Sequence, residues 1–218
     1  MFQCPYSDYC SSLYRENKNS SYLRIFHASP NSPAVDIYLD NKLAVRWLPY
    51  KGFSNYLKIA PGRYNIKVFP ASKRDSAVIN TNITVPERVI MTNAVIGSLP
   101  NISLFPISEP VFPRTQNKVY IRFIHLSQNA PKVDVIVPGK GKVFSGVGYK
   151  EKTDYITLNA GIYTFDVNVS GTDKRVLHVP NIKLFANKIY TIYAVGLVGA
   201  TPPLQVVIPL DGNSYIEV

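Results

Sequence analysis

Hydrophobic and polar residues alternate strictly in two stretches that occupy matching places in the two halves of the chain. In residues 62–70, GRYNIKVFP, the side chains of Tyr64, Ile66 and Val68 alternate with charged and polar ones. Residues 161–170, GIYTFDVNVS, show the same alternation. A period of two places successive side chains on opposite faces of a β-strand. Each stretch therefore predicts a strand with one buried and one solvent-facing side.

Further short apolar segments are separated by turn-forming residues along the rest of the chain. In the first half they predict strands at 22–27, 34–39, 43–48, 54–59, 78–84, 89–96 and 102–107. The second half has counterparts that end in YTIYAVGL and LQVVIPL. Short strands separated by turn-forming residues in this way predict an all-β fold built from immunoglobulin-like Greek-key β-sandwiches.

The opening of each half repeats one sequence pattern. Residues 22–38 read YLRIFHASPNSPAVDIY, and residues 120–136, which begin 98 positions later, read YIRFIHLSQNAPKVDVI. Matches continue at a spacing of 99 as far as Gly97 and Gly196. A period of this length is a whole domain, much longer than a solenoid repeat. The sequence therefore predicts two homologous sandwiches in tandem.

The repeat divides the chain into four segments. We expect a flexible N-terminal tail at 1–20, a first β-sandwich at 21–107, a linker at 108–118 and a second β-sandwich at 119–218. The linker reads SEPVFPRTQNK. Its prolines predict an extended and fairly stiff connection. On this interpretation each sandwich is a stand-alone domain.

The shared residues of the two openings include the residue types of a hydrolytic triad. In the first half such a triad would consist of His27, Ser29 and Asp36. A hydrolase needs its serine beside the base, together with an orienting acid and an oxyanion hole. Instead, Ser29 precedes Pro30, and the chain contains no Gly-x-Ser-x-Gly elbow. Two complete sites would also be required. We therefore expect no catalytic residue and predict that the protein is not an enzyme.

A structural loop motif explains the same residues with fewer requirements. Its members are Arg24, His27, Ser29 and Asp36 in the first half and Arg122, His125, Ser127 and Asp134 in the second. Serine hydroxyls at the start of a loop can bond to nearby backbone N–H groups, and a partly buried histidine can bond to the same loop. We also expect Arg24 to pair with Asp36, and Arg122 with Asp134, across adjacent strands.

Composition and charge limit the classes of partner. Hydrophobic residues make up 46% of the chain, and 15 tyrosines and 17 prolines suit an all-β protein. The net charge of +10 is dispersed over both halves, which favours loose attraction to anionic polymers over specific nucleic-acid binding. No segment is long and apolar enough to span a membrane. Residues 1–20 lack a charged region followed by an apolar core, so we expect no export signal and synthesis in the cytoplasm.

Both cysteines, Cys4 and Cys10, lie in the N-terminal tail, outside the duplication. In an oxidising environment they would cross-link subunits, and the tail could lie along an exposed sheet edge of a neighbouring subunit. Two reduced thiols in a disordered tail are the alternative. The three histidines are not clustered with cysteines or carboxylates at ligand spacing, so we expect no metal site and no cofactor.

The combined pattern L-R-x-x-H-x-S-P-x-x-P-x-V-D-x-Y, followed by S-x-Y and P-G-x-Y-x-I-x-V, resembles the bacterial family named domain of unknown function 4397. The stretch VPNIKLFANKIYTIYAVGLVGATPPLQ is similar to the second half of two-domain members from spore-forming Firmicutes. The resemblance covers about residues 21–210. It implies a tandem β-sandwich of surface, secreted or envelope proteins, with no established reaction or cofactor. The second copy departs from the pattern at Gln128 and at Pro138-Gly139.

These observations favour a non-enzymatic, self-assembling structural protein of a spore or cell surface. It would form a homo-oligomer or polymer in which the tail links the subunits. The alternative is a binding module for glycans or anionic cell-wall polymers, with Trp47, Tyr50 or Phe53 as candidate exposed aromatics.

Overall fold

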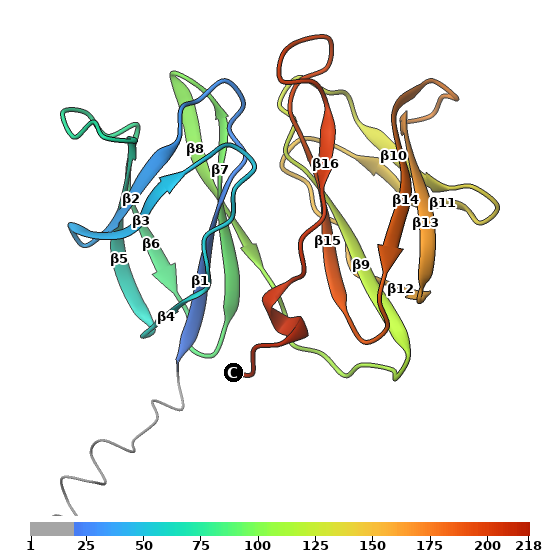
Figure 1. Ribbon diagram of the computed structural model, residues 1–218, viewed down its shortest axis with the longest axis horizontal. Coiled ribbons are helices and arrows are strands. Elements are labelled where there is room, and N and C mark those ends of the chain that lie inside the picture. The colour runs from blue at the N-terminus through green and yellow to red at the C-terminus, as the bar shows by residue number, and fades with distance from the viewer. Residues whose placement is uncertain (1–19) are drawn as a thin grey trace, which may run out of the picture.

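The structure is a computed structural model that describes residues 20–218 and forms two β-sandwiches side by side (Figure 1). The first sandwich contains β1 (Ser21–His27), β2 (Val35–Leu39), β3 (Lys42–Leu48), β4 (Leu57–Ile59), β5 (Gly62–Pro70), β6 (Ile79–Val85), β7 (Ile90–Ser98) and β8 (Asn101–Ser108). The second contains β9 (Lys118–His125), β10 (Val133–Val137), β11 (Gly141–Val147), β12 (Ile156–Asn159), β13 (Gly161–Val169), β14 (Arg175–Leu184), β15 (Ile189–Val195) and β16 (Gln205–Val207). The prediction of an all-β chain with two sandwich-like halves is confirmed.

Each sandwich consists of an outer sheet and an inner sheet that faces the other half (Figure 1). The first half has the outer order β3-β2-β5-β6 and the inner order β4-β1-β7-β8. The second half repeats these orders as β11-β10-β13-β14 and β12-β9-β15-β16. In the inner sheets β1 runs parallel to β7, and β9 runs parallel to β15. The duplicated sequence is therefore also a duplicated topology.

Each sandwich has its own apolar core, and the alternating strands supply much of it. Ile66 and Val68 of β5 are fully buried in the first core. Phe165 and Val167 of β13 occupy the matching places in the second core. Burying one such side chain stabilises the fold by about 1.5–3 kcal/mol relative to leaving it in water. The alternation read from the sequence is thus the pattern that closes each sandwich.

A third apolar cluster lies between the two inner sheets and belongs to both halves. Its buried members are Phe26, Ala28, Ala94, Ile96 and Ile107 from the first half and Ile124, Leu126, Tyr193 and Val195 from the second. The ring of Phe26 stacks on Phe53 with 4.0 Å between centroids, and its centroid lies 4.9 Å from that of Tyr193. The expectation of two stand-alone sandwiches is therefore corrected. Both faces of β7 and β15 are covered, so these strands are buried along almost their whole length.

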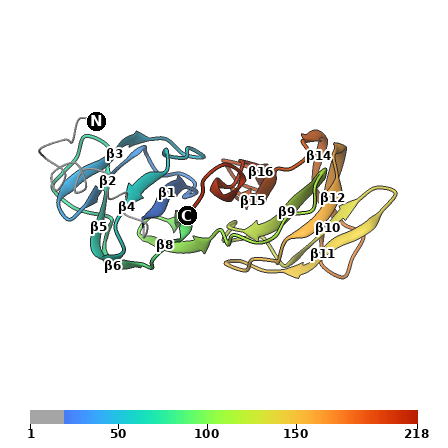
Figure 2. The ribbon, with the colours of Figure 1, turned by 90° about the horizontal axis from the view of Figure 1, so that it is seen from below.

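The C-terminal segment returns from the second half to the first. It contains the short 3-10 helix η1 (Gly212–Ser214), which lies between the two sandwiches in Figure 1. Nδ2 of Asn213 donates to the carbonyl oxygen of Pro110 at 2.8 Å, and Nη2 of Arg88 donates to that of Val218 at 3.0 Å. Figure 2, seen from below, also places the C-terminus between the halves. The segment therefore helps to fix the two sandwiches against each other.

Candidate functional site

The histidines of the repeated motif lie at the ends of β1 and β9 and hold the loop that follows. Nε2 of His27 donates to the carbonyl oxygen of Pro33 at 3.0 Å, and Nδ1 accepts from the backbone N–H of Ser29 at 3.4 Å. Nε2 of His125 likewise lies 3.2 Å from the carbonyl oxygen of Pro131. Burial lowers the pKa of both histidines below 6.5, because the charged ring would lose its hydration. Both rings are therefore neutral supports for a loop.

The hydroxyl groups of the two motif serines donate to backbone carbonyl groups. The sequence had predicted that they bond to backbone N–H groups. Oγ of Ser29 donates to the carbonyl oxygen of Gly97 at 2.6 Å, and Oγ of Ser127 donates to that of Gly196 at 2.7 Å. Gly97 and Gly196 have φ values of +85° and +87°, and an added Cβ would come within 2.2 and 2.1 Å of a backbone oxygen. Each serine thus ties the loop after the first strand to a tight turn that only glycine fits.

The aspartates of the motif lie on the outer sheets, where they hold a bulge. The carboxylate of Asp36 accepts from the backbone N–H of Trp47 at 2.7 Å, and that of Asp134 accepts from Gly146 at 2.7 Å. Both donors have positive φ, and the pairing of β2 with β3 and of β10 with β11 shifts register nearby. Lys142, at 2.6 Å, holds the pKa of Asp134 well below its ordinary value.

The serine, histidine and aspartate side chains therefore do not form a triad. In the described part of the chain, the hydrogen bonds of the Ser29 hydroxyl go to Gly97 and Ser32, and those of the Asp36 carboxylate go to backbone N–H groups. No proton path from serine to histidine to aspartate exists in this arrangement.

The predicted pairing of Arg24 with Asp36 and of Arg122 with Asp134 is wrong. Nη2 of Arg24 lies 3.2 Å from Oε1 of Glu109, and Nη2 of Arg122 lies 3.6 Å from Oδ2 of Asp211. Arginine and aspartate fall in different sheets of their sandwich, since β1 and β9 belong to the inner sheets and β2 and β10 to the outer ones. The arginines therefore point into the region between the halves.

The two arginines also bind backbone carbonyl groups of the opposite half. Nη1 of Arg24 donates to the carbonyl oxygen of Leu210 at 3.0 Å, and Nη1 of Arg122 donates to that of Ser108 at 2.8 Å. Nε of each arginine donates to a threonine hydroxyl of the neighbouring strand, at 3.0 Å for Thr92 and 2.8 Å for Thr191. We call Arg24, Glu109, Arg122 and Asp211 the interface charge cluster. Its members cross-connect the two halves in a nearly symmetric way.

Aromatic hydroxyls complete the interface charge cluster. Tyr56 donates to Oε2 of Glu109 at 2.6 Å, and Tyr155 donates to Oδ2 of Asp211. The guanidinium of Arg24 lies 4.5 Å from the ring centroid of Tyr56, and that of Arg122 lies 4.5 Å from that of Tyr155. Burial and the negative charge of Glu109 raise the pKa of Asp211 to about 6. Each charge in the cluster thus has an opposite charge nearby and accepts or donates hydrogen bonds, while Nη2 of Arg122 and Oδ1 of Asp211 have no hydrogen-bond partner among residues 20–218.

Glu109 and Asp211 were not singled out from the sequence, although a signal for them exists. Each is a single acid that follows the last strand of its copy, in ISEP for Glu109 and in PLDG for Asp211. Their side chains are fully buried. An isolated acid just after the last strand of each copy indicates a partner for the buried arginine of the repeat.

Only one of the three candidate aromatics lies open to solvent. The side chain of Trp47 is 61% exposed. Phe53 stacks on Phe26 in the cluster between the halves, and the ring of Tyr50 packs edge-on against His27. The last two therefore do not form an aromatic binding platform.

The remaining predictions concern cysteines, metals and membranes. Cys4 and Cys10 lie outside the described residues. Within residues 20–218, no group of three or more histidine, cysteine, aspartate or glutamate side chains could hold a metal ion. In the same part of the chain, no helix has the length and apolar character needed to span a membrane.

The duplicated topology and the duplicated buried motif define a tandem β-sandwich protein in which both copies use their shared polar residues for support. The chain belongs to the family described as Domain of unknown function (DUF4397), whose model matches residues 21–136 and 133–214. The resemblance seen in the sequence is thereby confirmed. No curated protein matches the chain.

Several solved structures are distantly similar. The C-terminal domain of AlgF from P. aeruginosa is 20% identical, with a TM-score of 0.34, over 44% of this chain and 99% of that one. The Bacillus anthracis TIE protein is 14% identical, with a TM-score of 0.26, over 86% of this chain and 34% of that one. The family 26 carbohydrate-binding module of Eubacterium rectale Amy13K, solved with maltoheptaose, is 10% identical, with a TM-score of 0.28, over 89% and 99%.

Arg24→Met tests the interface charge cluster. The change leaves the buried carboxylate of Glu109 without its cation, so we expect a loss of about 3–5 kcal/mol in the free energy of unfolding, measured by urea denaturation. Arg24→Met combined with Glu109→Gln should recover part of this loss. Arg175, whose ion pair with Asp166 is half-exposed, is the control, and Arg175→Met should change stability by less than about 1 kcal/mol. Equal effects of Arg24→Met and Arg175→Met would contradict the burial of the cluster.

The buried histidines predict a loss of stability in mild acid. Because their pKa is lowered in the folded protein, the unfolded chain binds protons more tightly, and stability falls as the pH drops below 6.5. The raised pKa of Asp211 acts in the opposite direction, since its contribution falls as the pH rises from 3.8 to about 6. The double variant His27→Gln/His125→Gln keeps Asp211 and isolates the histidine effect. Urea midpoints at pH 5.5 and 7.5 should differ less in this variant than in the wild type, and an unchanged difference would refute the assignment.

Proposed function

We propose that this protein is a non-enzymatic structural protein whose two sandwiches form one rigid unit of a larger assembly at a spore or cell surface. The observation that supports this proposal is the use of the duplicated polar residues. Each of them stabilises a loop, a bulge or the interface charge cluster, so we assign none of them to a reaction with a substrate. A pair of sandwiches held rigidly in this way suits a load-bearing or lattice-forming role.

The edge strand β6 supports assembly through sheet edges. β6 reads INTNITV and contains neither a charged residue nor a proline, and within residues 20–218 it pairs only with β5. The other edge strands of the two outer sheets, β3, β11 and β14, each carry lysine or arginine, which discourages pairing with another chain. An uncharged edge can accept a strand from another subunit, and the N-terminal tail with Cys4 and Cys10 would supply the link.

We also propose that each sandwich is an immunoglobulin-like Greek key. The hairpins β2-β3, β5-β6 and β7-β8, together with the crossings between the two sheets, favour this type. Superposition of an experimental structure on immunoglobulin-like domains would test it.

Assembly predicts a dependence on the tail and on its thiols. The wild type, purified under oxidising conditions, should form covalent oligomers on non-reducing gels and ordered polymers in electron micrographs. Cys4→Ser/Cys10→Ser should remove the covalent species, and deletion of residues 1–19 should remove both. Ser29→Ala and Ser127→Ala should leave any esterase or peptidase activity in the preparation unchanged. A monodisperse monomer that does not respond to oxidant or to the deletion would refute the proposal.

A binding module for glycans or anionic cell-wall polymers is the second candidate. The exposed Trp47, next to the exposed Arg46 on the edge strand β3, combines a stacking surface with a positive charge. Trp47→Ala should then reduce retention on purified cell-wall polymer at least several-fold, and retention should weaken as salt rises. Trp47→Phe serves as the matched control. Absence of retention at low salt would exclude this function.

A further inference from the structure

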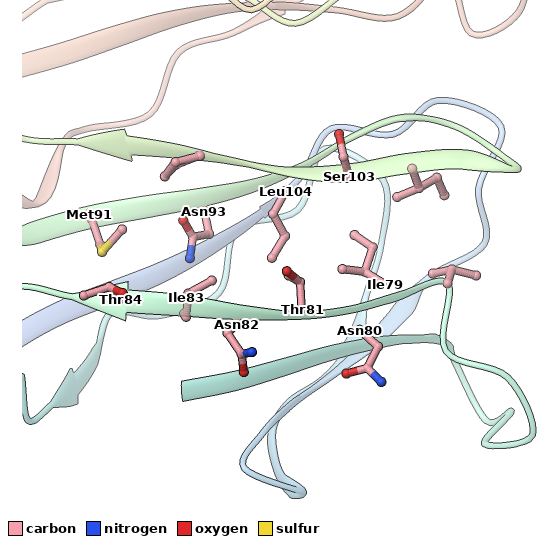
Figure 3. Close-up of a pocket in the computed structure, with 13 residues that line it drawn as sticks. Ile79, Asn80, Thr81, Asn82, Ile83, Thr84, Met91, Asn93, Ser103 and Leu104 are labelled. Atoms are coloured by element: carbon pink, nitrogen blue, oxygen red, sulfur yellow. The ribbon is translucent and has the colours of Figure 1, made fainter. Parts of the chain in front are cut away.

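A groove opens along the first sandwich, where its two sheets end in the edge strands β6 and β8 (Figure 3). Its volume is about 580 Å³, within the range of roughly 300–1,000 Å³ that is usual for small-molecule sites. Ile79 and Thr81 of β6 line one wall, and Met91 of β7 and Leu104 of β8 line the other. The groove therefore has the size and the mixed lining of a ligand site.

Asn93 of β7 lies in this groove with an unpaired amide. Its side chain is 1% exposed, and neither Oδ1 nor Nδ2 has a hydrogen-bond partner among residues 20–218. Figure 3 shows the nitrogen of Asn93 directed from β7 toward β6. A buried amide without partners destabilises a folded protein, so its presence calls for a reason beyond folding.

The second half shows that the fold itself does not need an amide at this position. Asn93 pairs with Ile25 of β1, and the corresponding residue of the second half, Ile192, pairs with Phe123 of β9. Ile192 is 1% exposed and belongs to the apolar core. The polar side chain is thus specific to the first copy, where the groove also lies.

The lining restricts the chemistry of the ligand. Among the described residues, none of those that line the groove is charged, so a charged group placed there would lose its hydration without a compensating partner. None of them is aromatic, which removes the stacking surface that a sugar would use. The carboxamide of Asn93 offers an N–H donor and a C=O acceptor side by side. A second carboxamide can pair with it, because its C=O accepts from the N–H of Asn93 and its N–H donates to the C=O of Asn93.

We propose that the groove of the first sandwich binds a small uncharged molecule with an apolar body and a carboxamide head. The head pairs with Oδ1 and Nδ2 of Asn93, and the body lies against Ile79, Met91 and Leu104. The groove adjoins β6, the edge strand of the proposed assembly, but ligand binding and tail-dependent oligomerisation are measured separately, so either can fail without the other.

Octanamide is a suitable probe, titrated into the ¹⁵N-labelled full-length protein. We expect saturable shifts of the Asn93 side-chain NH₂ signals and of the β6 backbone amides, with at least ten-fold weaker binding of octanoate. Asn93→Ile, which copies the second half, should abolish binding and raise the thermal midpoint. Thr81→Trp, which fills the groove from β6, should abolish binding without touching the amide. Asn101→Ala is the matched control and should bind normally, since Asn101 is exposed and does not line the groove.

Three results would overturn the proposal. The first is the absence of saturable shifts in the wild type, and the second is equal binding of octanamide by the wild type and by both groove variants. The third is an affinity for octanamide that rises when residues 1–19 are deleted. Such a rise would mean that the N-terminal segment occupies the groove in the full-length protein.

Discussion

The structure depends on a buried cluster of four charges between its halves. Arg24 and Arg122 are almost fully buried, and a buried guanidinium is tolerated only with an anionic partner and hydrogen bonds. The partners, Glu109 and Asp211, stand just after the last strand of each copy. Each arginine also holds a backbone carbonyl group of the other half. Moving the sandwiches apart would therefore break these carbonyl contacts and expose both charge pairs to water, and the apolar cluster around Phe26 and Tyr193 adds to this constraint.

This constraint explains why the shared polar residues of the two copies are poor candidates for chemistry. The histidines and serines shape loops, the aspartates hold bulges, and the arginines join the halves. All of these roles are needed in each copy, so they explain the duplication without a repeated active site. Features that differ between the copies remain free for other roles. They include the uncharged edge β6, the exposed Trp47 and the groove around Asn93.

Much of the fold could be predicted from the sequence, because a strand with one buried face leaves a period of two in residues such as Ile66 and Val68. The repeat in the sequence predicted that there are two sandwiches. The interface could not be read in this way. β7 and β15 are covered on both faces, and a mostly apolar strand does not say what covers its second face. The partner of Arg24 was missed because Glu109 lies 85 residues away, in a segment that was interpreted only as a linker.

Asn93 shows how a duplicated fold can gain a site in a single copy. The same register position holds Ile192 in the second half, where an apolar side chain completes the core. A duplication relaxes the demand on one copy, since the other still supports the shared interface. Replacing a core aliphatic residue by an amide then weakens one sandwich locally, and the interface charge cluster lies on the opposite face of the inner sheet, where Arg24 bonds to Thr92, the neighbour of Asn93. Two joined sandwiches can therefore tolerate an open, partly polar groove in one of them. A single sandwich on its own buries a smaller share of its surface and would be destabilised more by such a groove.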